Sequence, residues 1–519
     1  MIPSSAASQT SAAAQENLVF AAKGGGVTFA GRIFEYGGRF VLGILLARLM
    51  GAQELGLYGL AYAMVAILNG VSLLGLDTAV VRGIPIFRRR GDEASLRGLL
   101  LAGLGLPFAI GLVGGAGVFL FAVPLAERVY QEPALAPVLR MVSVAIPFSV
   151  LAFATIPATR GFKKMHYKVL AQDVTLTGLK IVLVLILAFT GLNAVKAIAA
   201  HTVAIFVSCS MLLYFLHRLF PLNRPFRSAR FHLWETFRFS LPMYLSRLME
   251  MFGNNLQTIL LGVLNTAAAV GIFTVASRVS VVGNLFHSSI VETARPVVSD
   301  LYNRGARAEL AHFYQNMTKW TFTFNLPIFF TICLFARPIL SIFGQDFVGG
   351  SLALTILAAG NLVNAATGIC GVVIVMTGHT WLNMVNSVLT LALTLVLNIL
   401  LVPSMGVVGA AIAVGSTVGI LNILRAAEVY ILLQMFPYNW QFAKPLIAGV
   451  GAWGGAYLLT HWLFAEPTFG QAVLGGIVLV TLYGAGVFLL GLSADDRVIL
   501  SRLSGRARRA FSPSPSGTD

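Results

Sequence analysis

Charged side chains occur inside some of the most apolar stretches of this sequence. Arg32, Glu35 and Arg39 are spaced by three and four residues, so a helix places them in one polar stripe. An ionisable side chain at the centre of a bilayer costs roughly 2.5 to 3.5 kcal/mol on insertion scales, which means that it needs a partner or a function. A guanidinium group binds phosphate through two parallel hydrogen bonds. This stripe could therefore hold an anionic substrate.

A second apolar stretch carries a similar stripe. Arg247, Glu250 and Asn254 have the spacing of the first three residues, and Asn255 lies beside them. Arg278 follows in the next apolar stretch. If each of the two stretches is the first helix of one half of the protein, the two helices would present their polar stripes to each other across a central cavity.

Two interpretations of these residues stay open. In one, each glutamate pairs with the arginine three residues before it, and the pairs hold helices in register. In the other, the residues face a water-filled cationic cavity that binds a phosphate or diphosphate, and the excess of arginines over glutamates favours this one. The predicted substrate-binding residues are Arg32, Arg39, Arg247, Arg278 and Lys180; Glu35 and Glu250 are candidates for coupling to H+ or Na+, and Asn69, Asn254, Asn255 and Asn284 for the polar lining.

Two further carboxylates end predicted membrane spans. Asp77 has Arg82 close by in sequence, and Glu292 has Arg295. Each pair could be an interfacial clamp or an inner gate whose ion pair breaks on opening. Asp77 and Glu292 are therefore further candidates for ion coupling or gating.

The composition defines the elements that must position these residues. The chain has 519 residues, of which 57% are hydrophobic and 11% charged, and its mean hydropathy is +0.82. Soluble globular proteins carry about 25% charged residues, so this composition excludes them, as it excludes disordered chains and disulfide scaffolds. At roughly 20 apolar residues per span, the sequence predicts an all-α polytopic membrane protein with about fourteen transmembrane helices.

The net charge of +16 follows from the predicted topology. With the N-terminus inside, 25 Lys and Arg residues fall in cytoplasmic segments and 3 in outer ones. Because an excess of Lys and Arg marks the cytoplasmic side, both termini are predicted to be cytoplasmic, and nucleic acid is not expected as a partner. Residues 1–22 show no cleaved signal peptide, and three isolated cysteines indicate neither a disulfide framework nor a zinc site.

Motifs of enzymes and ATPases are missing from the sequence. It contains no DxD, no HExxH and no Gly-Lys dipeptide, so no phosphate-binding P-loop can form. The predicted outer loops are all short. We therefore expect a transporter driven by a gradient, with no cofactor and no enzymatic activity.

The chain contains an internal repeat at an offset of 215 residues. Residues 32–79 align without gaps with 247–294, and identical pairs include Arg32/Arg247, Glu35/Glu250, Gly38/Gly253, Gly56/Gly271 and Asn69/Asn284. Parallel repeats of this kind form two transporter lobes around a central substrate site. The predicted parts are a tail 1–22, an N-lobe 23–220, a basic linker 221–238, a C-lobe 239–433, two extra spans within 434–493, and a basic tail 494–519.

The stretch Leu46-Ala47-Arg48 through Gly51-Ala52-Gln53-Glu54 to Gly56-Leu57-Tyr58 resembles the first two spans of polysaccharide or O-antigen flippases. These belong to the multidrug/oligosaccharidyl-lipid/polysaccharide exporter superfamily. The run Gly406-Val407-Val408-Gly409-Ala410-Ala411 also looks like that family. The resemblance implies alternating access that moves a polyprenyl-diphosphate-linked oligosaccharide to the outer leaflet of a bacterial inner membrane. It implies as partners the lipid-linked oligosaccharide, membrane lipids, H+ or Na+, and other glycan-assembly membrane proteins.

The related lipid II flippases carry arginines in the first, second and eighth spans. Arg32 and Arg39 match the first-span pair, and Arg278 matches the one in the eighth span. The Asp-Ala-Phe run of their second span is replaced by Gly56-Leu57-Tyr58, and the middle of that span holds no arginine. These departures argue against a lipid II substrate.

Two other functions remain as alternatives. One is a cation-coupled multidrug exporter of the same superfamily, which buried arginines disfavour because such exporters bind cationic compounds. The other is a membrane glycosyltransferase or ligase, which the short outer loops disfavour.

Overall fold

The structure is a computed structural model that describes residues 4–221, 229–231, 233–463, 468–491, 493 and 496–497. Side chains are described from residue 34 onward, except at positions 233, 235, 236, 239, 242, 243, 246, 247, 250, 254, 285 and 461. Helices and turns make up this described part, and it holds no strand. The prediction of an all-α fold is confirmed.

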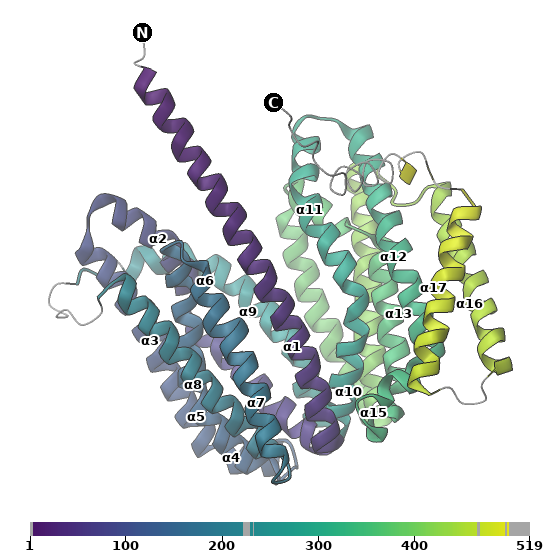
Figure 1. Cartoon of the computed structure of the whole chain (residues 1–519), viewed down its shortest axis with the longest axis horizontal. Helices are drawn as coiled ribbons and strands as arrows, with labels where there is room; N and C mark the ends of the chain where they lie inside the picture. The colour runs from purple at the N-terminus through teal and green to yellow at the C-terminus, as the bar shows by residue number, and fades with distance from the viewer. Residues whose placement is uncertain are drawn as a thin grey trace, which may run out of the picture. The chain divides into compact units, whose positions relative to one another are not determined.

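The chain divides into two compact units (Figure 1). The first comprises Met1–Ala276, Ile342–Gly350 and Ser387–Ala413. Its elements are α1 (Ser4–Leu73), α2 (Leu76–Arg90), α3 (Glu93–Leu120), α4 (Ala122–Pro124), η1 (Leu125–Val129), α5 (Leu135–Gly161), α6 (Met165–Lys168), η2 (Val169–Leu176), α7 (Thr177–Ala188), α8 (Ala194–Leu219), α9 (Leu233–Leu264), most of α10 (Ala267–Ser280), η5 (Gln345–Gly350) and the middle of α15 (Thr380–Leu433).

The second unit comprises Ser277–Ser341, Ser351–Asn386 and Val414–Asp519. Besides the ends of α10 and α15, it contains η4 (Val281–Gly283), α11 (Asn284–Asn303), α12 (Arg307–Ser341), α13 (Ser351–Thr367), α14 (Cys370–Met376), η6 (Trp440–Phe442), α16 (Ala443–Leu463) and α17 (Phe469–Leu489). The predicted lobe boundaries remain a prediction.

Two of the longest helices are each broken by a glycine. In α1, Gly51 has a φ of 75°, and in α15, Gly406 has a φ of 54°. Glycine adopts these left-handed values without steric cost, so each element is two helices joined end to end, and each covers two of the predicted spans. Gly191, which aligns with Gly406 in the repeat, also has a positive φ of 74°.

The described residues form nine helices that are long and apolar enough to cross a membrane. The segments Ala267–Gly283 and Phe286–Asn303, bent by 50°, would make a tenth if they form one span. The chain is thus a multi-pass membrane protein, and the count of fourteen spans stays a prediction.

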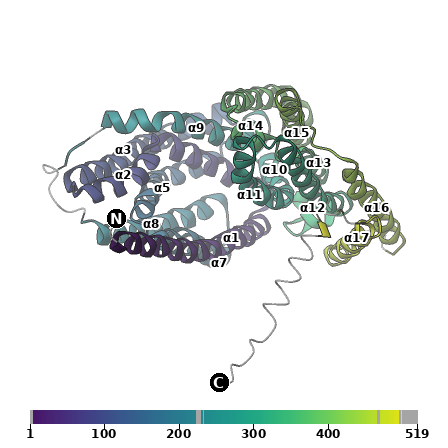
Figure 2. The same ribbon diagram turned by 90° about the horizontal axis from the view of Figure 1, so that it is seen from above.

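Hydroxyl groups in these apolar helices bond to their own backbone. Thr155 donates to the carbonyl of Leu151 at 2.7 Å, and Thr202 donates to that of Ile198 at 2.8 Å. Inside a bilayer no water can satisfy such groups, so a bond to the preceding turn removes most of the cost of burying them. The helices α3, α5 and α8 can therefore pack side by side in the first unit through largely apolar faces (Figures 1 and 2).

Residues of the flippase-like stretch hold the break of α1 in place. Arg48 donates from Nε to the carbonyl of Ile342 at 2.5 Å. Glu54 accepts the backbone N–H of Ala194 at 2.6 Å, which caps the first turn of α8 with a negative charge. These contacts tie α1 to the turn at Ile342 and to the start of α8, both far away in the sequence.

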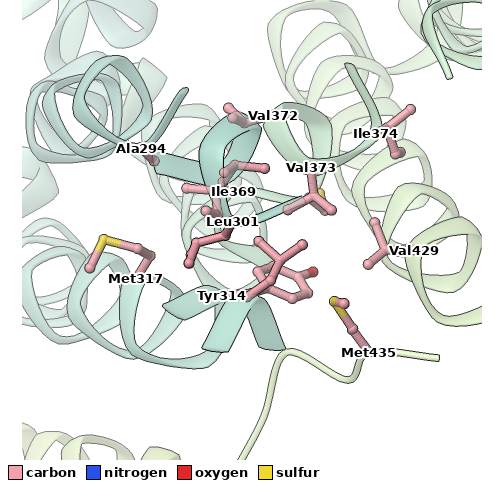
Figure 3. Packing of buried hydrophobic residues seen from close by; sticks show 13 residues of the cluster. Ala294, Leu301, Tyr314, Met317, Ile369, Val372, Val373, Ile374, Val429 and Met435 are labelled. Carbon is pink, nitrogen blue, oxygen red and sulfur yellow. The ribbon is translucent and has the colours of Figure 1, made fainter. Parts of the chain in front are cut away.

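The second unit has a separate apolar core around Tyr314 (Figure 3). Its ring is fully buried among side chains of α11, α12 and α14, and its hydroxyl donates to the carbonyl of Thr367 at 3.3 Å. Val429 and Met435 close the cluster from the end of α15 and the loop after it.

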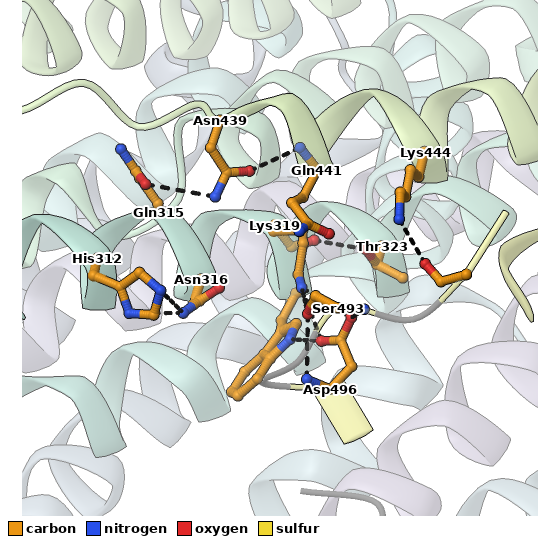
Figure 4. A network of polar contacts seen from close by, with 12 residues as sticks. His312, Gln315, Asn316, Lys319, Thr323, Asn439, Gln441, Lys444, Ser493 and Asp496 are labelled. Atoms are coloured by element: carbon orange, nitrogen blue, oxygen red, sulfur yellow. Dashed lines mark hydrogen bonds and ion pairs between the residues drawn. The ribbon is translucent and has the colours of Figure 1, made fainter. Parts of the chain in front are cut away.

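A polar network joins the first half of α12 to the residues that follow α17 (Figure 4). The ammonium of Lys319 lies 2.8 and 2.9 Å from the two carboxylate oxygens of Asp496, and it donates to Ser493 at 2.8 Å. The indole N–H of Trp320 donates to the same carboxylate at 2.8 Å. The four side chains satisfy one another where the chain leaves its last described helix.

Candidate functional site

A cavity of about 540 Å³ lies within the first unit. Its wall comes from α1, α2, α5, α6, η2, α8 and α9. The volume falls within the ~300–1,000 Å³ of typical ligand pockets. The polar and aromatic side chains that line it are Glu35, Arg39, Tyr62, Asn69, Asp77, Ser149, Phe153, Arg160, Lys168, Gln172 and His201.

Glu35 is the shared partner of two cations in this cavity. One carboxylate oxygen lies 2.7 Å from the guanidinium of Arg39, and the other lies 3.7 Å from the ammonium of Lys168. Lys168 also pairs with Asp173, whose side chain is fully buried. Arg160, in the last turn of α5, adds a third cation to the wall. We call Glu35, Arg39, Arg160 and Lys168 the charged cluster.

Four uncharged or aromatic side chains form a second group in the wall. Asn69 donates from its amide nitrogen to the hydroxyl of Ser149 at 2.8 Å. The ring of His201 meets the ring of Tyr62 edge-on, with 5.4 Å between the centroids. We call Tyr62, Asn69, Ser149 and His201 the neutral cluster. The cavity can therefore bind an anion through one cluster and a polar, uncharged group through the other.

Local helix geometry explains how the charged cluster forms. Glu35 and Arg39 are four residues apart on α1, a spacing that brings side chains into contact. A turn with Lys163 at a φ of 60° separates α5 from α6. The chain then enters the π-helix η2, which directly follows Lys168 and contributes Gln172 to the wall. Such π-helical turns occur frequently at functional sites.

Four of the predicted site residues line this one cavity. Glu35 and Arg39 come from the first part of α1, Asn69 from its second part, and Asp77 from the first turn of α2. Asp77 is buried, with 9% of its surface exposed. Their roles in binding, gating or ion coupling stay predictions.

Lys180 lies next to the cavity. Its ammonium is 5.4 Å from the ring centroid of Tyr58 and 5.3 Å from that of Tyr62. Lys180 is itself buried, with 8% of its surface exposed. Lys180 does not line the described cavity itself and reaches its wall only through Tyr62, so direct binding of substrate stays a prediction for this residue.

The other predicted residues lie elsewhere. In the second unit, Arg278 is exposed, Asn284 donates to Asn361 at 3.0 Å, and Glu292 pairs with Arg295 at 3.6 Å. In α9, Asn255 donates to the carbonyl of its own preceding turn, at Met251. The side chains of Arg32, Arg247, Glu250 and Asn254 lie outside the described residues.

Sequence reasoning missed Lys168, Arg160, Tyr62 and His201 as members of this site. Arg160 and Lys168 flank a break between apolar stretches, so the sequence places both among the cations of the predicted cytoplasmic segments. A weak signal for Tyr62 was present, since Tyr58 and Tyr62 are four residues apart and share a helix face. Within the described residues, no group of three or more His, Cys, Asp or Glu side chains could hold a metal ion.

A family model described as "Polysaccharide biosynthesis protein" matches residues 45–349, which is more than half of the chain. Two similar curated proteins come from Haloferax volcanii. The "Probable low-salt glycan biosynthesis flippase Agl15" is 28% identical over 236 residues, which are 44% of this chain and 49% of that protein. The "Probable flippase AglR" is 24% identical over 287 residues, or 54% and 58% of the two chains. The chain thus spans about half the length of these relatives.

Two solved structures share the fold. A structure titled "Lipid II flippase MurJ, inward closed conformation" superposes with a TM-score of 0.70 and 15% identity, covering 91% of this chain and 98% of that one. An inward-facing multidrug resistance MATE family transporter of the MOP superfamily has a TM-score of 0.62 and 17% identity, covering 78% and 94%. At these identities the likeness concerns the fold alone. The predicted fold class is confirmed by this likeness.

Proposed function

The chain belongs to the polysaccharide biosynthesis protein family, and we propose that it is a flippase for a polyprenyl-diphosphate-linked oligosaccharide. It moves this lipid between the leaflets of a cytoplasmic membrane and carries out no covalent chemistry. The two relatives named as probable flippases, one of them in glycan biosynthesis, support this function.

The observation that carries the proposal is the charged cluster. Arg39, Arg160 and Lys168 line one cavity, and the carboxylates in its wall are Glu35 and Asp77. A third carboxylate, Asp173, pairs with Lys168 from outside the described wall, so the site offers three cationic groups to a ligand with several negative charges without a large net charge of its own. Arginine and lysine are the side chains that bind phosphate groups most strongly.

Glu35 gives this binding a means of coupling to an ion gradient. In the structure it holds Arg39 and Lys168. A diphosphate that takes over these two cations leaves Glu35 without partners, and Glu35 can then take up a proton or a sodium ion. Because a ligand shifts a conformational equilibrium only through unequal affinity for its states, the cluster must hold the diphosphate more tightly when the cavity opens to the cytoplasm.

The location follows from the same proposal. The substrate is made on the cytoplasmic face, so we place the protein in the cytoplasmic membrane of a bacterial cell, with both termini inside. The balance of 25 cationic residues against 3 in the predicted loops supports this orientation. Reporter fusions at the C-terminus that fluoresce only in the cytoplasm test it.

The direct test is a translocation assay with the full chain in lipid vesicles. A polyprenyl diphosphate with a fluorescent sugar analogue is placed in both leaflets, and a membrane-impermeant quencher reports which molecules reach the outside. Lipid in the inner leaflet is protected from the quencher until it is moved outward. We expect the protein to increase the rate of this movement, and the rate to depend on the pH or sodium gradient. A rate equal to that of protein-free vesicles under every gradient would overturn the proposal.

A cellular experiment identifies the glycan that the transported lipid carries. Depletion of the protein should cause one polyprenyl-diphosphate oligosaccharide to accumulate, as measured by mass spectrometry of the lipid extract, and the matching surface polymer should disappear. An unchanged lipid pool with intact surface glycans would instead favour export of small molecules.

A further inference from the structure

We propose that the neutral cluster is a binding subsite for the pyranose ring attached to the diphosphate, with Tyr62 as its stacking platform. This proposal rests on the flippase function and adds the part of the substrate that the protein recognises. The charged cluster would hold the diphosphate, and the neutral cluster would distinguish a glycosylated lipid from a bare one. Both clusters line the same cavity, so one ligand can touch both.

Tyr62 has the properties of a stacking surface. Its side chain lines the cavity and remains 41% exposed, whereas Tyr58 one turn earlier is 4% exposed. The two rings are stacked at 17°, with 6.0 Å between centroids, which fixes the orientation of Tyr62. A rigid aromatic ring provides contact area at a low cost in conformational entropy. The C–H face of a pyranose is a flat apolar surface that fits such a ring.

The cluster also has hydrogen-bonding groups that nothing in the described structure uses. Within the part of the chain that the structure describes, both ring nitrogens of His201 and the amide oxygen of Asn69 lack a hydrogen-bond partner. These side chains are 3% and 8% exposed and belong to the cavity wall. A buried polar group without a partner costs about 1–3 kcal/mol, so a ligand that bonds these groups recovers that cost.

The chemistry of the unused groups favours hydroxyls. Neutral histidine offers one donor and one acceptor, and the oxygen of Asn69 accepts. Sugar hydroxyls both donate and accept, so they match such a mixed set, which a phosphate oxygen or an aliphatic chain does not. Ser149, bonded to Asn69 at 2.8 Å, extends the set by a further hydroxyl.

A cationic aromatic compound fits this cluster less well. The ammonium of Lys180 already lies over the rings of Tyr58 and Tyr62, at 5.4 and 5.3 Å. A second cation on these rings would be repelled by it and by the charged cluster. The size of the cavity, about 540 Å³, leaves room for the diphosphate and its first sugars rather than for a complete oligosaccharide.

The test compares binding of glycosylated and bare lipids to the full chain in nanodiscs. The probes are polyprenyl diphosphate and the same lipid carrying glucose, galactose or N-acetylglucosamine. We expect wild type to bind at least one glycosylated probe about tenfold more tightly than the bare lipid. Tyr62→Leu should remove this preference by weakening the glycosylated probes much more than the bare lipid, whereas Tyr62→Phe, which keeps the ring, should retain most of the preference.

Two further variants control for general effects. His201→Leu should weaken only the glycosylated probes, by several-fold. Tyr214→Leu removes a tyrosine of α8 that is 58% exposed and does not belong to the described cavity wall, and it should change nothing.

The outcomes separate the two proposals. Wild type that binds bare and glycosylated lipids equally well overturns the sugar subsite and leaves the flippase proposal intact. The subsite is also overturned if Tyr62→Leu weakens all probes by the same factor, since Tyr62 would then support the cavity only structurally. Wild type that binds none of the four lipids overturns the flippase function and the subsite together.

Discussion

Gly56 and Gly271, which align in the internal repeat, lie against each other's helices in a reciprocal contact. A Cβ atom on Gly56 would overlap the backbone carbonyl of Ala267, and one on Gly271 would overlap that of Ala52. Ala52 and Ala267 are themselves an aligned pair of the repeat. The contact therefore has the local two-fold symmetry expected where two parallel repeats meet.

Substitution of either glycine by alanine should destabilise the protein. No flexible side chain can move aside, because the added methyl meets backbone, so we expect Gly56→Ala and Gly271→Ala to cost about 1–3 kcal/mol each. Thermal unfolding of the purified protein in detergent measures the loss. Gly178→Ala is the matched control, since its Cβ would meet nothing within 4 Å. A Gly56→Ala variant as stable as Gly178→Ala would show that the two helices do not touch in the folded protein.

The helical fold and part of the cavity could be predicted from the sequence alone. Periodic apolar stretches predict membrane helices because a bilayer leaves the backbone few other choices. Glu35 and Arg39 could be found because a charge inside such a stretch is costly and therefore conspicuous. Their spacing of four residues predicts the contact that the structure contains.

Lys168 could not be found in that way. It lies near the end of a short basic connection, where lysines are common and cost nothing, so its sequence context indicates a solvated loop. Only the turn between α5 and α6 places its ammonium near Glu35 and Asp173. His201 is similar, since a single histidine in an apolar helix has no spacing pattern, and its contact with Tyr62 depends on how α8 packs on α1.

Removal of the carboxylate of Glu54 should weaken the start of α8. Glu54 accepts the N–H of Ala194 at 2.6 Å, and a negative charge stabilises a helix N-terminus. The N-cap residue Asn193 keeps its own bond to the backbone N–H of Lys196, so we expect Glu54→Ala to lower the free energy of unfolding by about 0.3–2 kcal/mol, the range for a charge at a helix terminus. Glu132→Ala serves as the control, because the bond of Glu132 to Gln53 is solvent-exposed and contributes little. Equal melting temperatures for the two variants would contradict a capping role.

Asp496 should make the stability of the second unit depend on pH in the acid range. Burial alone would raise the pKa of its carboxyl, but hydrogen bonds from Lys319, Trp320 and Ser493, with the charge of Lys319, lower the pKa from 3.8 to about 2. A depressed pKa contributes stability that is complete above pH 4 and is lost as the pH falls towards 2. The advantage of wild type over Asp496→Asn should therefore shrink between pH 4 and pH 2.

Unfolding curves of both proteins at several pH values measure this difference. Asp300→Asn is a suitable control, because Asp300 pairs with Arg304 at 2.8 Å but both side chains are more than half exposed. A gap between wild type and Asp496→Asn that stays constant from pH 5 to pH 2 would show that the carboxylate does not stabilise the fold through its charge.

Arg39 and Arg304 allow the binding role of an arginine to be separated from its structural role. Each pairs with a carboxylate four residues earlier, at 2.7 and 2.8 Å, and each is 57% exposed. Only Arg39 belongs to the wall of the cavity that the described residues form. The two arginines are equally exposed, and Glu35, which is 14% exposed, keeps Lys168 as a partner, while Asp300 is 62% exposed to water, so loss of either arginine should change stability by less than about 1 kcal/mol.

Their effects on translocation should differ. Arg39→Gln removes one of the cations that hold the diphosphate, and a charge-assisted hydrogen bond contributes about 1.5–3 kcal/mol, so the rate at low substrate concentration should fall at least about tenfold. Arg304→Gln should transport like wild type. Initial translocation rates of the two variants and wild type, measured in the vesicle assay at equal amounts of folded protein, test this difference. If both variants transport at the wild-type rate, Arg39 does not bind substrate, and the diphosphate must be held by other cations of the cavity.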